Sequence, residues 1–154
     1  MNGLAHAVRA RIEDRTCLVD DVVKGGCGAS LSDAPQPRVV IDLDETGSPL
    51  GGAQSKCDYL IFFADPSLVM LIEIKDGAPN VAKVERQLQA GARAADELAP
   101  RGVAVLCRPV LVSRALRHQK QVDLRKAVVR FRGREERVRR VACGDSLTDA
   151  LGNT

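Results

Sequence analysis

Two apolar runs decide how this chain folds: KCDYLIFF at residues 56–63 and LVMLIEIK at residues 68–75. A short turn that contains proline separates them, which predicts two antiparallel strands. Both runs nevertheless carry charges, at Asp58, Glu73 and Lys75. An ionised group in a strand buried on both faces costs several kcal/mol unless it is paired, hydrated or bound to a metal. We therefore expect the function of the protein to depend on these three residues.

Elements on either side predict an α/β domain around this pair of strands. Apolar residues recur at helical spacing after Asn80, a good helix cap, and Pro100 ends the pattern. The next apolar run is expected to lie parallel to the second of the two strands, through a right-handed crossover. Pro109 within that run favours an edge position or a bulge. The expected order is αβββαβ, with a mixed sheet flanked by helices: a helix at 3–15, strands at 38–44, 56–64 and 68–75, a helix at 80–98 and a strand at 103–113.

The remaining segments lie outside this core of about residues 4–113. Residues 20–37 are rich in Gly, Ser, Asp and Pro, which predicts a surface loop. Residues 114–143 predict a short helix followed by a β-hairpin whose strands lie at 127–131 and 136–141. This hairpin region is basic, and its arginines either contact the phosphate backbone of nucleic acid or form one solvated face of a strand pair. The candidates are Arg130, Arg132, Arg134, Arg137 and Arg139.

Length and composition favour one soluble domain that spans residues 1–154. The hydrophobic fraction of 45% is that of an ordinary globular protein, and no run is long enough to cross a bilayer, so we expect no membrane partner. Five cysteines are an odd number, and the N-terminus lacks the apolar segment of a signal peptide. This pattern predicts a reduced, cytoplasmic setting with buried free thiols. Zinc binding by the cysteines other than Cys107 is a weaker alternative, because no Cys-x₂-Cys pair is present.

Strand alternation turns the three charges into one candidate site. Glu73 and Lys75 point to the same face of their strand, and the hairpin brings Asp58 close to both. Two carboxylates without a histidine or thiolate are hard oxygen ligands, suited to Mg²⁺ or Mn²⁺. Lys75 is placed to orient or help deprotonate a water and to offset negative charge that develops on phosphorus. These parts fit the hydrolysis of a phosphodiester.

An acid on the second strand, Glu-x-Lys on the third and an amphipathic helix after them resemble the PD-(D/E)xK superfamily of restriction-endonuclease-like nucleases. The resemblance implies a restriction-endonuclease-like fold and a Mg²⁺-dependent nuclease, acting most plausibly on DNA in DNA processing or defence. It implies Asp58, Glu73 and the carbonyl of Ile74 as metal ligands, and Lys75 as the catalytic lysine.

The same resemblance suggests two further site residues, and this sequence departs from the family pattern at two positions. Family members often carry a glutamine on the following helix and an extra acid on the first helix, and Gln87 and Glu13 match these positions. Without the resemblance, both read as solvent-facing helix residues. Cys57 stands where many members have proline before the acid. Gly91 stands four residues after Gln87, where the exonuclease-type branch has tyrosine.

Three alternatives to an active nuclease stay open. The charges at Asp58, Glu73 and Lys75 also fit a structural salt bridge at the rim of a sheet. The same fold also fits a non-catalytic module that binds nucleic acid or a protein partner, and the small size of the chain favours this reading. A third alternative is a homodimer in which a second subunit completes the site.

Overall fold

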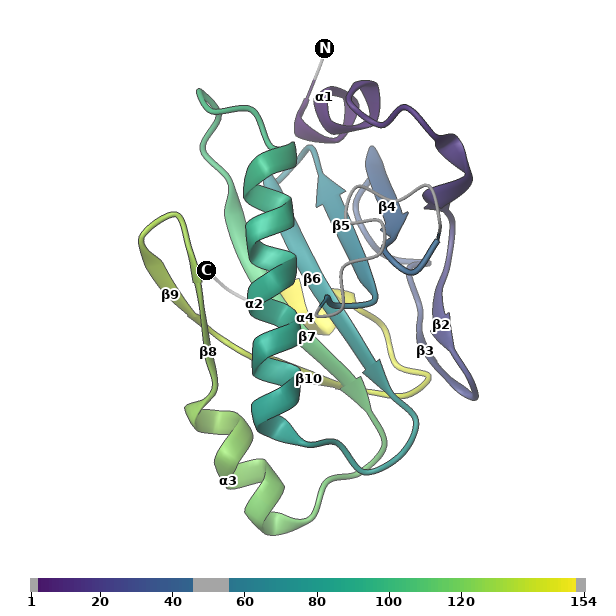
Figure 1. Cartoon of the computed structure of the whole chain (residues 1–154). Helices are drawn as coiled ribbons and strands as arrows, with labels where there is room; N and C mark the ends of the chain where they lie inside the picture. Colours follow the sequence, from purple (N-terminus) through teal and green to yellow (C-terminus); the bar gives the residue numbers. More distant parts are fainter. Residues whose placement is uncertain (1–2, 46–55, 152–154) are drawn as a thin grey trace.

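The computed structural model describes residues 3–45 and 56–151 of the chain (Figure 1). In this part, the main sheet has the spatial order β1-β4-β5-β6-β7-β10. Its strands are β1 (Leu18–Val19), β4 (Arg38–Asp42), β5 (Tyr59–Phe63), β6 (Leu68–Lys75), β7 (Leu106–Ser113) and β10 (Arg139–Ala142). Strands β1, β4, β5 and β6 pair antiparallel, whereas β6–β7 and β7–β10 pair parallel. The predicted α/β class with a mixed sheet is therefore confirmed.

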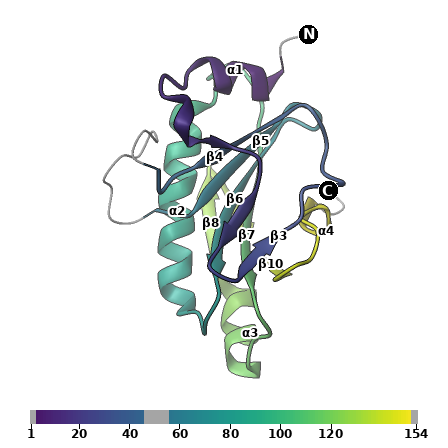
Figure 2. The same cartoon turned by 90° about the vertical axis from the view of Figure 1, so that its right-hand side faces the viewer.

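Strand β5 and most of β6 are apolar because both of their faces are covered. Helix α2 (Val81–Leu98) packs on one face, and the other face carries the hairpin of β2 (Val22–Lys24) and β3 (Cys27–Ala29) together with α4 (Thr148–Leu151). Figure 2 shows the three layers edge-on. Successive residues of β5 enter opposite cores: Phe62 packs on the α2 side and Phe63 on the hairpin side. Continuous apolar runs are typical of strands buried in this way.

Helix α2 follows the sequence prediction closely. The side chain of Asn80 accepts a hydrogen bond from the backbone N–H of Lys83 at 3.0 Å, which caps the helix. One face of α2 is buried on the sheet, from Val84 through Leu88 to Ala95. The chain leaves the helix at Ala99, directly before Pro100. Only residues 76–80 separate the end of β6 at Lys75 from the start of α2.

Two predictions in the N-terminal third are wrong in detail. Helix α1 (Leu4–Ala10) ends well before Arg15, and a 3-10 turn, η1 (Arg15–Cys17), follows it. Residues 20–37 are not only a loop, because β2 and β3 pair within them and pack under the main sheet. Glycines mark the turn between these strands, and Gly25 has φ +61, a conformation that favours glycine. A strand pair this short lacks the long alternation that sequence reasoning requires.

The C-terminal segment forms the predicted helix and hairpin, with one difference. Helix α3 (His118–Lys126) is followed by β8 (Val128–Phe131), which pairs antiparallel with β9 (Arg134–Arg137). The second predicted hairpin strand, 136–141, is divided, because its later part is β10 and joins the main sheet beside β7. Strand β7 therefore lies inside the sheet and not at the edge position that Pro109 favours. Strand β10 pairs with β7 only from Val110 onward, so Pro109 precedes that pairing.

The cysteines differ from the prediction of five free thiols. Cys27 and Cys143 form a disulfide across 116 residues of sequence, which joins the β2–β3 hairpin to the segment after β10. Cys17, Cys57 and Cys107 are buried free thiols, as predicted. Because disulfides persist mainly in oxidising compartments, this bond argues against the reduced setting inferred from the cysteine count. A cytoplasmic location stays a prediction.

Candidate active site

The candidate site lies where β6 ends, between α2 and the β2–β3 hairpin. Val69 and Leu71 of β6 belong to the core on the α2 side, and alternation places Glu73 and Lys75 on that same face. The ammonium nitrogen of Lys75 lies 2.9 Å from Oε2 of Glu73. The predicted common face of these two residues is therefore present. The side chain of Glu73 is completely buried, whereas a quarter of the Lys75 side chain, 25%, is exposed.

Asp58 joins this pair through the backbone of β6. Its N–H donates to the carbonyl of Ile72 at 2.9 Å, which extends the β5–β6 ladder by one residue. Its Oδ2 accepts a hydrogen bond from the N–H of Ile74 at 2.7 Å. Asp58 is only 3% exposed. The structure thus brings Asp58 to the residue between Glu73 and Lys75, as the hairpin argument predicts.

Burial controls the protonation of both carboxyls. Removal from water and, after it, the charge of Asp58 raise the pKa of Glu73, and Lys75 opposes the rise, so that the pKa of Glu73 is about 7. Burial also raises the pKa of Asp58, opposed by Lys24 and by the N–H of Ile74. Among the described residues, Oε1 of Glu73 has no hydrogen-bond partner. Oε2 lies 2.9 Å from the ammonium of Lys75, whose charge and hydrogen bond oppose the rise in the pKa of Glu73.

Gln87 has a buried oxygen that also lacks a partner in the described chain, Oε1. The residue lies on α2 one turn before Gly91, on the side of the helix that packs on the sheet. A Cβ atom on Gly91 would overlap the sulfur of Cys57, so this face of α2 touches the residue directly before Asp58. Gln87 is partly buried and does not lie in open solvent. The role that the resemblance implies for Gln87 stays a prediction.

Glu13 does not join this group in the structure. It is exposed in the turn after α1, since the helix ends at Ala10. It is not among the charges that shift the pKa of Asp58 or Glu73. Its assignment as a metal ligand stays a prediction that the described geometry does not support.

Sequence reasoning missed Lys24, which comes from the segment predicted as a loop. Its ammonium nitrogen lies 2.7 Å from Oδ1 of Asp58 and 3.6 Å from Oδ2 of Asp44. The nearby carboxylates raise the pKa of Lys24 despite its partial burial. A lysine beside Gly25 and Gly26 in a turn carries no signal of such a contact. Only the packing of the hairpin against β6 brings it to the site.

The donor atoms at the candidate site are oxygens, the type that a hard divalent cation prefers. Among residues 3–45 and 56–151, no group of three or more His, Cys, Asp or Glu side chains gathers closely enough to hold a metal. Two carboxylates and backbone or amide oxygens remain, from Asp58, Glu73, Ile74 and Gln87. Mg²⁺ commonly binds through one or two carboxylates and keeps several waters. The unpartnered buried oxygens of Glu73 and Gln87 are consistent with this kind of site.

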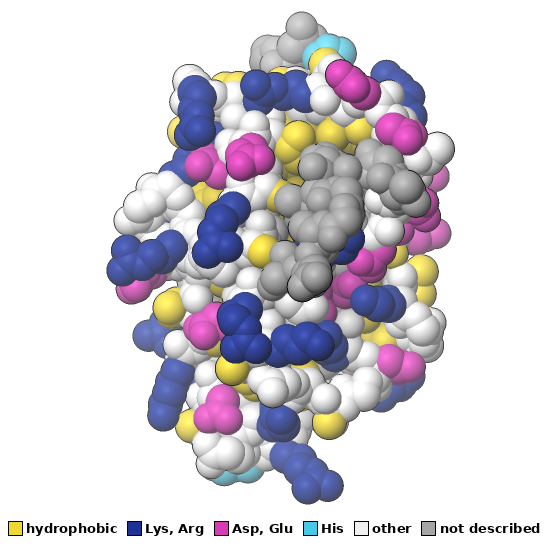
Figure 3. Space-filling view, viewed as in Figure 1, with side chains coloured by type: hydrophobic (Ala, Val, Ile, Leu, Met, Phe, Trp, Pro, Cys, Tyr) yellow, Lys and Arg dark blue, Asp and Glu magenta, His cyan; other side chains and the backbone are white. Residues whose placement is uncertain are grey.

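The hairpin arginines are not gathered at the candidate site. Strand β8 follows α2 toward the C-terminal end of the helix, with Val128 bonded to Glu85 and Arg130 bonded to Gln89 (Figure 1). The turn of the β8–β9 hairpin lies near the end of α2, away from Lys75. Figure 3 shows Lys and Arg side chains interspersed with acids over this face, without a single basic patch.

Most of these arginines already have protein partners. Arg132 donates to Asp96 at 2.7 Å and to the carbonyl of Val103 at 2.8 Å, and its guanidinium lies 5.5 Å from the ring centre of Phe131. It is a structural residue of the fold. The others make single contacts: Arg130 with Glu135, Arg137 with the carbonyl of Arg125, and Arg139 with the carbonyl of Ala150. Arg134 is exposed and has no side-chain partner within the described ranges.

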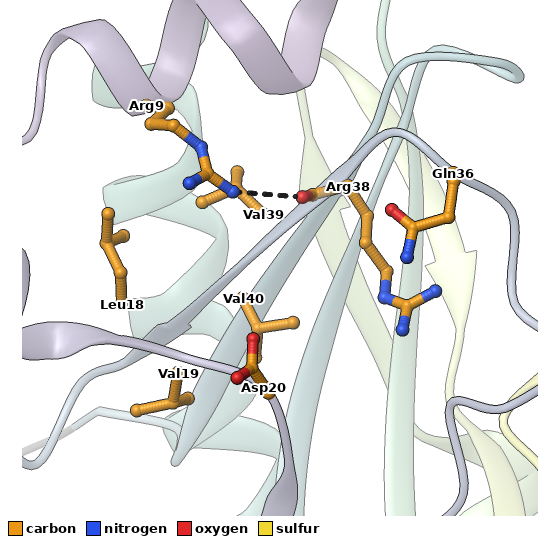
Figure 4. Close-up of a pocket in the computed structure, with 8 residues that line it drawn as sticks. All are labelled: Arg9, Leu18, Val19, Asp20, Gln36, Arg38, Val39 and Val40. Carbon is orange, nitrogen blue, oxygen red and sulfur yellow. Dashed lines mark hydrogen bonds between the residues drawn. The ribbon is translucent and has the colours of Figure 1, made fainter.

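Two hollows on the surface differ in their distance from the site along the fold. One of about 240 Å³ adjoins it, beyond Asp76, with Arg114, Arg117 and Lys120 in its lining. Another of about 230 Å³ lies at the outer edge of the sheet, beside β1 and β4, where Arg9 donates to the carbonyl of Arg38 (Figure 4). It contains none of the predicted site residues.

Comparisons with protein-family models, with curated proteins and with solved structures find no match for this chain. Fold and geometry therefore define its class: an α/β protein whose mixed sheet carries a buried acid–lysine cluster at the end of its central strands. Within the described residues, no helix combines the length and apolar character that a membrane span requires.

Proposed function

We propose that the protein is a Mg²⁺- or Mn²⁺-dependent nuclease that hydrolyses phosphodiester bonds of nucleic acid, with DNA as the expected substrate. One observation carries the proposal: the carboxylate of Glu73 is completely buried, Lys75 is paired with its Oε2, and its Oε1 has no hydrogen-bond donor among the described residues. A buried carboxylate of this kind is costly unless a cation completes its surroundings. Asp58 beside it supplies the second carboxylate that a shared ion requires.

The residues have separate roles in this proposal. Asp58, Glu73 and the carbonyl of Ile74 would hold the cation. When bound, the cation polarises the phosphodiester and lowers the pKa of a water. Lys75 lies at the boundary between protein and solvent, where it orients the attacking water and offsets charge on phosphorus. Gln87, on the side of α2 that packs on the sheet, would position the water or a phosphate oxygen.

A non-catalytic binding module is the second candidate, and one observation favours it. Each carboxylate already has its own lysine, since Lys24 pairs with Asp58 and Lys75 pairs with Glu73. Paired in this way, the four residues also serve as a structural ion-pair cluster on a surface that binds nucleic acid or protein. In either case, a homodimer remains an alternative for completing the surface.

Cleavage assays separate the two candidates. The wild-type protein and Lys75→Ala are incubated with plasmid and with single-stranded DNA, in EDTA, Mg²⁺ or Mn²⁺. We expect cleavage by the wild type only with a divalent cation, and a loss of at least about a hundredfold in Lys75→Ala. Lys126→Ala, at the exposed end of α3, is the matched control and should cleave normally. DNA binding without cleavage by the wild type, at high protein concentration, would favour the binding module.

A further inference from the structure

The β2–β3 hairpin presents a second lysine to the candidate site. The Lys24 ammonium lies 2.7 Å from Oδ1 of Asp58, a carboxylate whose other oxygen is bonded to the backbone of β6. The two partners differ in exposure: the side chain of Lys24 is 54% exposed and that of Asp58 is 4% exposed. Lys24 therefore reaches from solvent onto the carboxylate and closes its open side. Its ammonium occupies Oδ1 of Asp58, an oxygen that a divalent cation would need as a ligand.

The backbone around Lys24 is held firmly in place. Cys27, the direct cross-strand neighbour of Lys24, is bonded to Cys143. On the β2 side, the hydroxyl of Tyr59 donates to the carbonyl of Val23 at 2.8 Å. These contacts fix where the lysine stem begins, whereas the flexible four-carbon stem leaves the ammonium free to change partners.

Contacts from the ends of β6 and β7 hold the turn of the same hairpin. The N–H of Gly26 donates to Asp76 at 3.3 Å, and Arg114 donates to the carbonyl of Gly26 at 3.2 Å. Arg114 and Asp76 are themselves paired at 2.8 Å. A hairpin attached on both sides of the site stays beside it whether or not Lys24 is paired with Asp58.

We propose that Lys24 is a second functional lysine of this site, which competes with the divalent cation for Asp58 and then contacts the substrate phosphate. The inference rests on the proposed nuclease function. A divalent cation on Asp58 repels an ammonium at the same oxygen. The released ammonium stays within reach of the site, where a bound phosphodiester supplies a new anionic partner. Lys75 keeps the role proposed above, at the attacking water, so the two lysines have different roles.

Cation binding without DNA gives the first test. Mn²⁺ affinity is measured by titration calorimetry for the wild type, Lys24→Gln, Lys24→Arg and the control Lys126→Gln. Removal of the competing charge should tighten Mn²⁺ binding by about fivefold in Lys24→Gln, the scale of a half-exposed ion pair. Lys24→Arg and Lys126→Gln should bind as the wild type does. Unchanged or weaker Mn²⁺ binding by Lys24→Gln would overturn the competition.

DNA binding in Ca²⁺, which supports binding with slow or no cleavage, gives the second test. We expect Lys24→Gln to bind DNA about fivefold more weakly than the wild type and to reduce the salt dependence of binding by about one phosphate contact. Lys24→Arg should restore both. A purely structural role for Lys24 predicts lower thermal stability with the salt dependence unchanged, and that result would overturn the phosphate contact.

The wild type and Glu73→Gln separate failure of this inference from failure of the nuclease proposal. If the wild type binds neither Mn²⁺ nor DNA, the proposed function fails and the inference fails with it. If Glu73→Gln abolishes Mn²⁺ binding and Lys24→Gln leaves it unchanged, only the inference fails. Should Lys24→Gln not fold, the ¹⁵Nζ resonance of Lys24 in the wild type decides: it should shift on Mg²⁺ addition, and an unmoved resonance at saturating Mg²⁺ would contradict the competition.

Discussion

Gly91 of α2 lies against Cys57 so closely that a Cβ atom on the glycine would overlap the cysteine sulfur. This contact joins the helix to the residue before Asp58, and it accounts for a glycine in the middle of an 18-residue helix. It also sets the depth at which Gln87, one turn earlier, approaches the sheet. The helix and the acidic end of β5 are therefore packed as one unit.

Gly91→Ala should destabilise the protein despite the better helix propensity of alanine. Overpacking of a buried contact costs about 1–3 kcal/mol, and the gain in propensity is about 1 kcal/mol. We expect a net loss of up to about 2 kcal/mol in urea unfolding, and a smaller loss when Cys57→Ala is added to make room. Gly102→Ala, where a Cβ would meet no atom within 4 Å, is the control. Equal effects at both glycines would contradict the close contact.

The stability of the cation-free protein should depend on Glu73 in a defined pH window. Burial raises the pKa of Glu73 from the ordinary value of 4.5 to about 7, so between these values the folded state binds a proton that the unfolded chain has released. This contribution is fully present below 4.5 and is lost as pH rises through about 7. The free energy of unfolding, measured in urea at several pH values, should fall across the window in the wild type. A profile for Glu73→Gln with the same slope would argue against this burial.

Much of the fold was predictable from local patterns, because those elements are long. Strand β6 and helix α2 are as long as their apolar patterns, and their bounds agree with the prediction within a residue or two. The approach of Asp58 to Glu73 and Lys75 follows from alternation and a short turn alone. These are properties of neighbouring residues in sequence.

The features that sequence reasoning missed depend on contacts between distant segments. Lys24 reaches Asp58 only because a short hairpin, residues 22–29, packs under the sheet, and its turn glycines are equally typical of a loop. The Cys27–Cys143 bond spans 116 residues, and no spacing rule pairs the two. Strand β10 carries the same alternation as the hairpin beside it, so its pairing with β7 is decided by tertiary packing.

Loss of the disulfide should weaken the whole domain because the bond closes a long loop. A cross-link over 116 residues restricts the unfolded chain strongly, and removal of such a bond costs about 2–5 kcal/mol. We expect the double variant Cys27→Ser with Cys143→Ser to lose this amount in urea unfolding. A reductant should lower the stability of the wild type and leave the double variant unchanged. An equal response of both proteins to the reductant would show that the effect lies elsewhere.

The hairpin arginines should separate into structural and binding residues. Arg132→Ala removes the bonds to Asp96 and Val103 and should cost about 1–3 kcal/mol of stability. Arg134→Ala should leave stability within about 0.5 kcal/mol. If the hairpin contacts DNA, Arg134→Ala should also lower the magnitude of the salt slope of binding by about one. Stability is measured by thermal unfolding, and the slope by fluorescence titration at several salt concentrations. A change in stability for Arg134→Ala as large as that for Arg132→Ala would contradict the assignment.

Thermal stabilisation by Mn²⁺ tests whether Glu73 and Glu13 are metal ligands. A cation that binds only the folded state raises its stability by about 2.7 kcal/mol at a hundred times the dissociation constant, which is a clear shift in melting temperature. Glu73→Gln should lose this shift, because Glu73 is buried in the site. Glu13→Gln should keep it, since Glu13 is exposed after α1 and apart from both carboxyls. Differential scanning fluorimetry with and without Mn²⁺ measures the shift in melting temperature for both variants. A lost shift in Glu13→Gln would restore the ligand role implied by the family resemblance and would require the turn after α1 to move toward Asp58 when the cation binds.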